Sequence, residues 1–226
     1  MAWFRLTGWI VFAQLCLAGA LYGGDMPMPP RPNPMQGAVF KAESLPPGAR
    51  ERMTGVSWRE RCPVSLDDLA LLTVTHLGFD GKPHQGLLVV HQAVAGELLA
   101  IFRSLYLKGY PIEKMRLIED YGGSDEASMR DDNTSAFNCR PVTGGTAFSK
   151  HSYGLAIDIN PLYNPYIRGN ITLPPEGAAY VDRSLAVKGM IRANEICPRE
   201  FLVRGWTWGG NWESRKDYQH FEKALP

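Results

Sequence analysis

The sequence predicts an α+β domain with a small, mainly antiparallel sheet and flanking helices. Two apolar, β-branched runs, 69–76 and 85–91, enclose the turn signal Phe79-Asp80-Gly81-Lys82, which is typical of a β-hairpin. The next segment, 93–107, has apolar residues at helical spacing. Later strand-like segments are short and separated by loops, and this order favours α+β over a regularly alternating βα fold.

The elements follow in chain order. Glycine and proline end the helix at Gly109 and Pro111. A short strand is predicted over 115–119, and the polar run 121–132 is predicted to be a loop that holds a helical turn. The run GLAIDIN, 154–160, is predicted to be a strand.

The last third of the chain is predicted to be loop-rich. The run 160–182 holds four prolines and two Asn-Pro pairs, which indicate a long surface loop. A helix is predicted over 191–203, although Pro198 lies inside it. The segments 207–208 and 218–221 are predicted to be closing strands.

The size, composition and charge of the chain exclude some classes of protein. The chain has 226 residues, a mass of 25.1 kDa and a net charge of +1, which suits one folded domain. The hydrophobic fraction of 45% excludes a disordered chain. The near-neutral charge lacks the basic footprint of a nucleic-acid-binding protein, so no nucleic-acid partner is expected.

The first 22 residues are predicted to be a signal peptide. One arginine, Arg5, precedes the uncharged stretch 6–22, and Ala18-Gly19-Ala20 resembles a cleavage site. An uncleaved anchor is the alternative, since 17 residues only just reach the length of a span. No other stretch is apolar enough to enter a membrane. Because of the leader, the protein is expected to be exported, either to the periplasm or out of the cell. It is expected to be monomeric.

A proline-rich linker is predicted over 23–50, because 26–36 alone contains five prolines. The folded domain is placed at 51–226. Removal of the leader leaves three cysteines, so one disulfide and one free thiol are expected outside the cytoplasm. We predict the pair Cys62–Cys139, with pairings that involve Cys197 as the alternatives.

Two histidines lie in dense polar settings. His151 stands just before the predicted strand that carries Asp158, and His220 lies near the end of the chain in DYQHF. A carboxylate between apolar strand residues is costly to bury unless a metal or another charge compensates it. Two imidazoles and one carboxylate, with a fourth position open for water, make the ligand set of a catalytic zinc site.

These residues carry a resemblance to a known family. The pattern Ser-x-His-x-x-Gly-x-Ala-x-Asp at 149–158, followed by Asp-x-x-His at 217–220, resembles the zinc D-alanyl-D-alanine carboxypeptidases and L-alanyl-D-glutamate peptidases. This family includes the VanX/VanY-type enzymes and has the hedgehog/DD-peptidase fold. The segments NPLYNPY, 160–166, and WTWGGNW, 206–212, resemble its endopeptidase branch. The resemblance covers about 62–221.

The resemblance implies a role for each motif residue. His151, Asp158 and His220 would bind one Zn²⁺ per chain. Asp217 would be the general base that deprotonates the attacking water and then protonates the leaving amine. Arg140 would hold a substrate carboxylate or polarise the carbonyl, and Ser149 would lie on the substrate side and orient a ligand.

Simpler interpretations stand beside these. Arg140 could instead form a structural ion pair, and Asp217 could be an ordinary surface carboxylate, with Glu213 or Glu222 as the next candidates for the base. The other three histidines are expected to be structural: His76, His84 and His91. At least two of the three tryptophans in 206–212 are expected in the core.

The resemblance implies an exported zinc metallopeptidase that cuts a peptide bond in peptidoglycan stem peptides, as a carboxypeptidase or an endopeptidase. The main alternative is a non-catalytic, zinc-containing wall-binding module on the same fold. A structural or signalling domain, as in hedgehog-type proteins, is a third hypothesis.

Overall fold

The computed structural model describes residues 35–224, which form the α+β fold that the sequence predicts. The predicted signal peptide, 1–22, and most of the proline-rich run 26–36 lie outside the described residues. Within 35–224, none of the helices has the length and apolar character that crossing a membrane requires.

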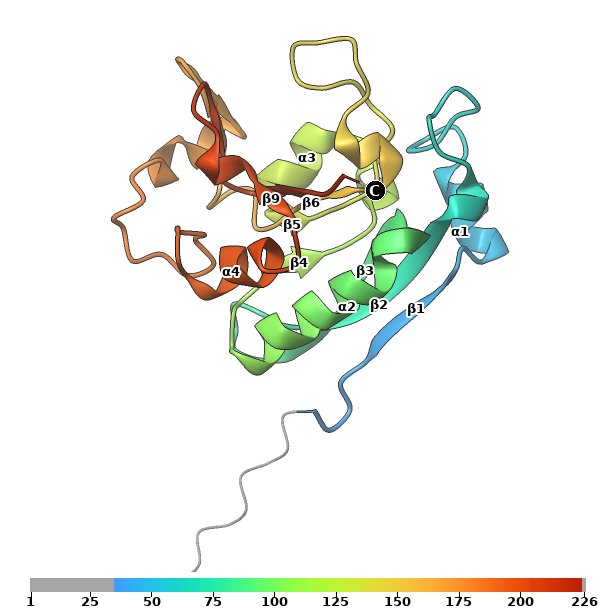
Figure 1. Cartoon of the computed structure of the whole chain (residues 1–226), viewed down its shortest axis with the longest axis horizontal. Coiled ribbons are helices and arrows are strands. Elements are labelled where there is room, and N and C mark those ends of the chain that lie inside the picture. Colours follow the sequence, from blue (N-terminus) through green and yellow to red (C-terminus); the bar gives the residue numbers. More distant parts are fainter. Residues whose placement is uncertain (1–34, 225–226) are drawn as a thin grey trace, which may run out of the picture. The chain divides into compact units, whose positions relative to one another are not determined.

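Figure 1 shows the order of the elements along the chain. The strands are β1 (Phe40–Ser44), β2 (Leu69–Leu77), β3 (Pro83–His91), β4 (Lys114–Met115), β5 (Asn133–Thr134), β6 (Ala156–Asp158), β7 (Tyr166–Arg168), β8 (Ile171–Leu173), β9 (Thr207–Trp208), β10 (Lys216–Asp217) and β11 (His220–Glu222). The α-helices are α1 (Pro47–Met53), α2 (Gln92–Leu107), α3 (Asp125–Arg130) and α4 (Ile196–Leu202).

The first sheet has the strand order β1-β2-β3 and is antiparallel. Its register pairs Leu69 with His91 and Leu77 with Pro83, which confirms the predicted hairpin. Strand β2 is buried on both faces. Leu72 packs into the core under α2, whereas Leu71 packs with α1 on the opposite face. This two-sided burial explains why β2 reads as a continuous apolar run rather than an alternating one.

Helix α2 confirms the prediction from helical spacing and lies along the first sheet (Figure 1). The side chain of His91 accepts a hydrogen bond from the backbone N–H of Ala93, at 3.1 Å, and so caps the helix as it leaves β3. The apolar face of α2 is buried through Val94, Ala95, Leu98, Ile101, Phe102 and Leu105. His91 is therefore structural, as expected.

Two further small antiparallel sheets carry the polar residues of the motif. One has the order β6-β11-β9, and the other has the order β10-β7-β8. A two-stranded parallel sheet joins β4 and β5. Ile157 of β6 and Phe221 of β11 are fully buried in the same core as α2, so the motif strands rest on the hydrophobic centre of the domain.

The prediction of a linker over 23–50 is wrong in its second half. Strand β1 pairs with β2 from Phe40 to Ser44, and α1 begins at Pro47, directly after its N-cap Pro46. Proline suits the first turn of a helix, because the N–H that it lacks has no partner there. Strand β1 is an edge strand with mostly exposed side chains, so it leaves no alternating pattern in the sequence.

Other boundaries also differ from the predictions. The run 160–182 is not a continuous loop, since it contains the hairpin β7–β8 and a 3₁₀ helix, η4 (Pro175–Tyr180). Helix α4 begins at Ile196 rather than at 191, which places Pro198 in the first turn, where it breaks no helical hydrogen bond. Strand β4 spans two residues instead of the predicted 115–119.

The predicted disulfide Cys62–Cys139 is present, with the two Cα atoms 6.0 Å apart, and Cys197 is a buried free thiol. The backbone beside Cys139 also contacts the motif, because the N–H of Asn138 donates to the carbonyl of His151. Two of the three tryptophans are buried in the core, Trp206 and Trp208, as expected.

Candidate metal centre and active site

The turn that carries His151 is held by residues on both sides of it. His151 lies in the 3₁₀ helix η3 (Lys150–Tyr153), and the Ser149 hydroxyl caps this helix by accepting from the His151 N–H at 3.3 Å. Gly154 ends η3 with φ +66°, and a Cβ at this position would lie 2.5 Å from the backbone nitrogen of His91. Only glycine allows the chain to turn there, against β3, and enter β6.

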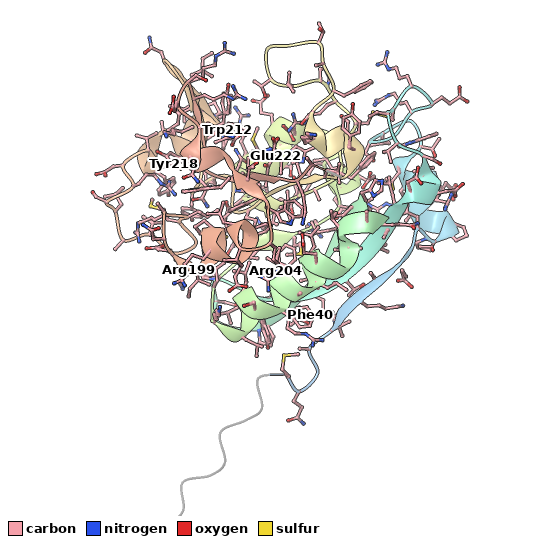
Figure 2. The ribbon with its side chains drawn as sticks, in the orientation of Figure 1. Phe40, Arg199, Arg204, Trp212, Tyr218 and Glu222 are labelled. Atoms are coloured by element: carbon pink, nitrogen blue, oxygen red, sulfur yellow. A yellow bond between two sulfur atoms is a disulfide. The ribbon has the colours of Figure 1, made fainter. Side chains whose placement is uncertain are left out.

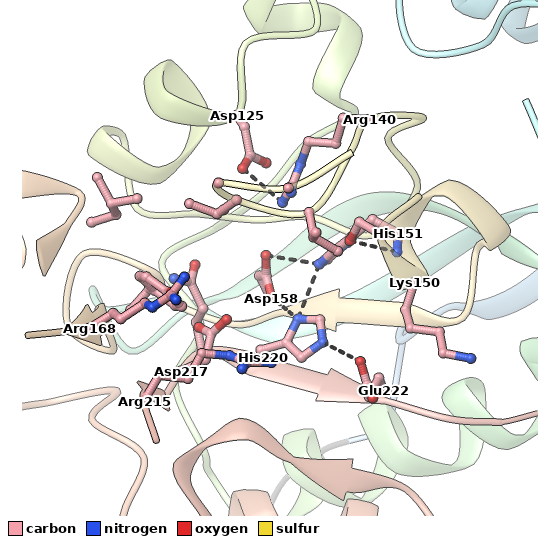
Figure 3. Close-up of a pocket in the computed structure, with 18 of the residues that line it drawn as sticks. Asp125, Arg140, Lys150, His151, Asp158, Arg168, Arg215, Asp217, His220 and Glu222 are labelled. Carbon is pink, nitrogen blue, oxygen red and sulfur yellow. Dashed lines mark hydrogen bonds and ion pairs between the residues drawn. The ribbon is translucent and has the colours of Figure 1, made fainter. Parts of the chain in front are cut away.

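Strand pairing brings Asp158 and His220 together. The register of β6 and β11 places these two residues directly opposite each other. His151 reaches the same point from η3, so that three buried side chains converge (Figure 3). His151 Nε2 lies 3.1 Å from Asp158 Oδ2, His220 Nδ1 lies 2.9 Å from Asp158 Oδ1, and the two imidazole nitrogens are 3.2 Å apart.

The outer nitrogen of each imidazole has its own partner. His151 Nδ1 donates to the carbonyl oxygen of Ala136 at 2.5 Å, and His220 Nε2 donates to Glu222 Oε2 at 3.1 Å. These bonds fix the tautomer of a neutral imidazole, because a carbonyl or a carboxylate can only accept. The inner nitrogens face Asp158. In the metal-free protein Nδ1 of His220 donates to this carboxylate, and once it loses its proton it would present a lone pair to a metal, as in most histidine metal sites.

The charges of the cluster are strongly coupled. Burial alone would raise the pKa of Asp158, but His151 and His220 outweigh it and hold this pKa far below its usual value. Burial disfavours the His220 cation, yet hydrogen bonds to Asp158 and Glu222 raise its pKa to about 10. Asp158 is therefore a carboxylate at any physiological pH.

The donor set fits a zinc ion. Donor atoms bound to tetrahedral zinc at about 2.0–2.1 Å stand about 3.3 Å apart. The two imidazole nitrogens are 3.2 Å apart, and each lies 2.9–3.1 Å from one or the other oxygen of Asp158. With one donor atom taken from each residue, the three atoms lie within 4.8 Å of one another, so they converge on one point. Among residues 35–224, this cluster is the group of histidine and carboxylate side chains that could hold a metal ion.

Asp217 lies on β10, three residues before His220, and lines the same cavity. Its Oδ1 atom is buried and has no hydrogen-bond partner within the described residues. Burial raises the pKa of Asp217 to about 7, although the nearby His220 lowers it. A carboxylate with a pKa near neutrality and one unpaired oxygen can accept and return a proton at physiological pH.

Arg140 lines the same cavity, but a carboxylate already binds one side of its guanidinium group. Its Nη2 atom is 2.8 Å from Asp125 Oδ2, which is the ion pair of the simpler interpretation, while its Nε is buried without a partner. A substrate carboxylate at Arg140 would therefore compete with Asp125. Ser149 also lines the cavity, but its hydroxyl is engaged in capping η3.

The cavity has a volume of about 430 Å³ and opens beside the His–Asp–His cluster. Trp212 forms part of its wall, with its ring centroid 5.5 Å from that of His220. Glu222, which was expected only as a reserve base, contacts His220 instead. Strand alternation places Glu222 on the same face as His220, and this signal could have identified it. Arg168 and Arg215 also line the cavity and are absent from the sequence predictions.

The segment that carries this cluster matches a known protein family. Residues 143–223 match a family model described as D-alanyl-D-alanine carboxypeptidase. The match supports a peptidase of the M15 family. It spans just over a third of the chain and contains His151, Asp158, Asp217 and His220. Arg140 lies outside it. M15 is a family of metallopeptidases, which agrees with the donor set. Neither a curated protein nor a solved structure matches the chain significantly.

Proposed function

We propose that this chain is an exported zinc metallopeptidase that hydrolyses a peptide bond in peptidoglycan stem peptides. The observation that carries the proposal is the buried cluster of His151, Asp158 and His220, with inner nitrogens aimed at one carboxylate and a cavity beside it. The match to a carboxypeptidase family supports the substrate class. One zinc ion per chain would be held by these three side chains.

The chain's own residues supply the proton transfer. A bound zinc ion supplies Lewis acidity, which polarises a carbonyl and acidifies water. Asp217 accepts the proton of the attacking water at its unpaired Oδ1 and then donates it to the departing amine. The environment that raises the pKa of Asp217 makes this carboxylate basic enough for the first step and acidic enough for the second.

Other side chains position the reacting groups. Ala136 and Glu222 hold the two imidazoles in the tautomers that metal binding requires. Trp212 supplies an apolar wall against which a peptide can pack. Arg140 contacts the substrate only through the part of its guanidinium that Asp125 leaves free.

The sequence motifs favour the endopeptidase branch, and digestion of purified peptidoglycan tests both activities. The zinc-loaded protein should release fragments whose masses, measured by mass spectrometry, identify the bond that is cut. Loss of a single residue from the C-terminus of the stem peptide would indicate a carboxypeptidase. Cleavage at an internal bond, which divides the stem peptide into two fragments, would indicate an endopeptidase.

Asp217→Asn is the matched control for this experiment. It should keep its zinc, because all three ligands remain, and lose turnover by about 10²–10⁴-fold, the usual contribution of general acid–base catalysis. Zinc content is measured on the same preparations. Full zinc with no hydrolysis by the wild-type protein would reject the peptidase and favour a wall-binding module.

A further inference from the structure

Two arginines face each other at the wall of the cavity. Strands β7 and β10 pair Ile167 with Lys216, and continuation of this antiparallel register places Arg168 opposite Arg215. Like charges directly opposite each other destabilise a sheet. Both side chains are exposed, so solvent screens part of this repulsion, and no neighbouring carboxylate within residues 35–224 neutralises the rest.

Strand alternation places this pair on the same wall as the proposed base. Tyr166, Arg168, Arg215 and Asp217 all line the cavity, whereas the intervening Ile167 and Lys216 do not. Arg215 and Asp217 are two residues apart along the strand, a rise of about 7 Å. This distance is the length of about two residues of extended peptide. Figure 3 shows both guanidinium groups on the Asp217 side of the cluster.

Three of the four carboxylates that line the cavity are already engaged elsewhere, and the fourth, Asp217, is the proposed base. Asp125 pairs with Arg140, Asp158 contacts both histidines, and Glu222 binds His220. Within residues 35–224, no carboxylate oxygen lies within 4.0 Å of the guanidinium nitrogens of Arg168 or Arg215. Arg215 instead stacks on Trp212, with its Cζ 4.4 Å from the ring centroid. The stacking holds one guanidinium in place without neutralising it.

We propose that Arg168 and Arg215 form a carboxylate-binding subsite that selects acidic peptides. The inference rests on the proposed peptidase function and deepens it by naming a specificity determinant. The bound group is a carboxylate of the peptide, within about two residues of the scissile bond. Two planar guanidinium groups can each donate paired hydrogen bonds to one carboxylate, and its negative charge offsets their mutual repulsion.

Three peptides test the subsite by binding. The probes are L-alanyl-γ-D-glutamyl-L-lysyl-D-alanyl-D-alanine, the same peptide with the glutamyl α-carboxylate amidated, and the same peptide with an amidated C-terminus. Calorimetry is performed on the zinc-loaded Asp217→Asn protein, in which hydrolysis of the peptides should be about 10²–10⁴-fold slower. We expect one amidation to weaken binding about 10-fold or more, because a hydrogen bond to a charged group is lost. The amidated peptide that binds more weakly shows which of the two carboxylates the subsite binds.

The variants are Arg168→Gln, Arg215→Gln and the double substitution, each in the Asp217→Asn background. Each single change should weaken binding of the acidic peptide by about 10-fold and leave the amidated peptide unaffected. Arg199→Gln is the control, since Arg199 is an exposed arginine on α4 that does not line the cavity. Figure 2 labels it apart from Trp212 and Glu222, which do line it. Melting temperatures should stay constant or rise in the single variants, because repulsion is relieved.

Equal affinity for all three peptides, or a preference that survives the double substitution, would overturn the subsite. Hydrolysis by the parent protein is measured separately with the same peptides. Hydrolysis without a carboxylate preference would reject the subsite and leave the peptidase intact. Carboxylate-dependent binding through both arginines without hydrolysis would support the subsite and reject the peptidase.

Discussion

At the scale of single residues, Glu222 determines which nitrogen of His220 is free to bind a metal. Its carboxylate accepts the Nε2 proton at 3.1 Å and thereby leaves Nδ1 facing Asp158. A side chain beyond the ligands can matter almost as much as a ligand, because it sets both tautomer and basicity.

We expect Glu222→Ala to weaken zinc binding by about 10- to 100-fold, the usual effect of removing a partner of a ligating histidine. Competition with a chromophoric chelator measures the affinity. Glu213→Ala is the control, since Glu213 is an exposed carboxylate on the same segment that does not line the cavity. An unchanged affinity in Glu222→Ala would show that His220 keeps its tautomer without this contact.

The metal-free cluster should release a proton when zinc binds. The pKa of His220 is raised to about 10, so its imidazole is protonated at pH 7.5, whereas a metal requires the deprotonated nitrogen. We expect about one proton to leave His220 at this pH, and zinc affinity to rise with pH up to about 10. Calorimetry in buffers with different ionisation enthalpies counts the protons. Affinity that does not change between pH 6 and 8 would contradict the raised pKa.

At the scale of elements, long periodic segments were predictable and short ones were not. The hairpin β2–β3 and helix α2 each bury several residues at a regular spacing, so the pattern identifies them. Strand β1 buries almost nothing, and β7 and β8 have three residues each, too few to show a period. Their pairing comes from tertiary context, which the local sequence does not encode.

The same reasoning applies to the candidate site. His151, Asp158, Asp217 and His220 were predictable because a short motif specifies their chemistry and spacing. The opposition of Arg168 and Arg215 depends on the register of strands that the sequence pattern does not reveal. The ion pair between Arg140 and Asp125 likewise joins two loop segments and requires the folded chain.

Gly154 shows how one turn controls both folding and the site. Gly154→Ala should lower the free energy of unfolding by about 1–2 kcal/mol for its positive φ. A further loss of about 1–3 kcal/mol should follow because the new Cβ would lie 2.5 Å from the His91 nitrogen. Gly169→Ala is the matched control, with φ +56° and nothing within 4 Å of the new Cβ. Urea unfolding measures both, and equal losses would show that the close approach to β3 costs nothing.

At the scale of the whole molecule, the family-matched region does not make the site alone. Residues 143–223 contain the candidate ligands, yet the carbonyl that orients His151 comes from Ala136. Figure 1 shows β6 and β9 above α2, and their core side chains pack together with those of β2 and β3. The first sheet and α2 therefore support the strands that carry Asp158 and His220, so global stability and site geometry are coupled.

Asp132 should make that stability depend on pH. Asp132 is buried, and its Oδ2 has no hydrogen-bond partner within the described residues. Burial raises the pKa of Asp132 to about 8, although the hydrogen bond from the Leu162 N–H lowers it. The folded state therefore keeps a proton that the unfolded state releases above about pH 4. This contribution to stability is complete below pH 4 and is lost as the pH rises toward 8, at up to about 1.4 kcal/mol per pH unit.

Asp132→Asn removes the titrating carboxyl group and keeps a side-chain oxygen that can accept the hydrogen bond from the Leu162 N–H. Asparagine also tolerates the φ of +51° at this position. The variant should therefore gain stability relative to the wild-type protein as the pH rises from 5 to 8. Urea unfolding at several pH values measures the difference, which cancels the titration of all other groups. Asp68→Asn, at an exposed carboxylate, should follow the wild-type curve. A difference between wild type and Asp132→Asn that stays constant with pH would show that Asp132 is ionised in the folded protein, because only a shifted pKa makes stability depend on pH.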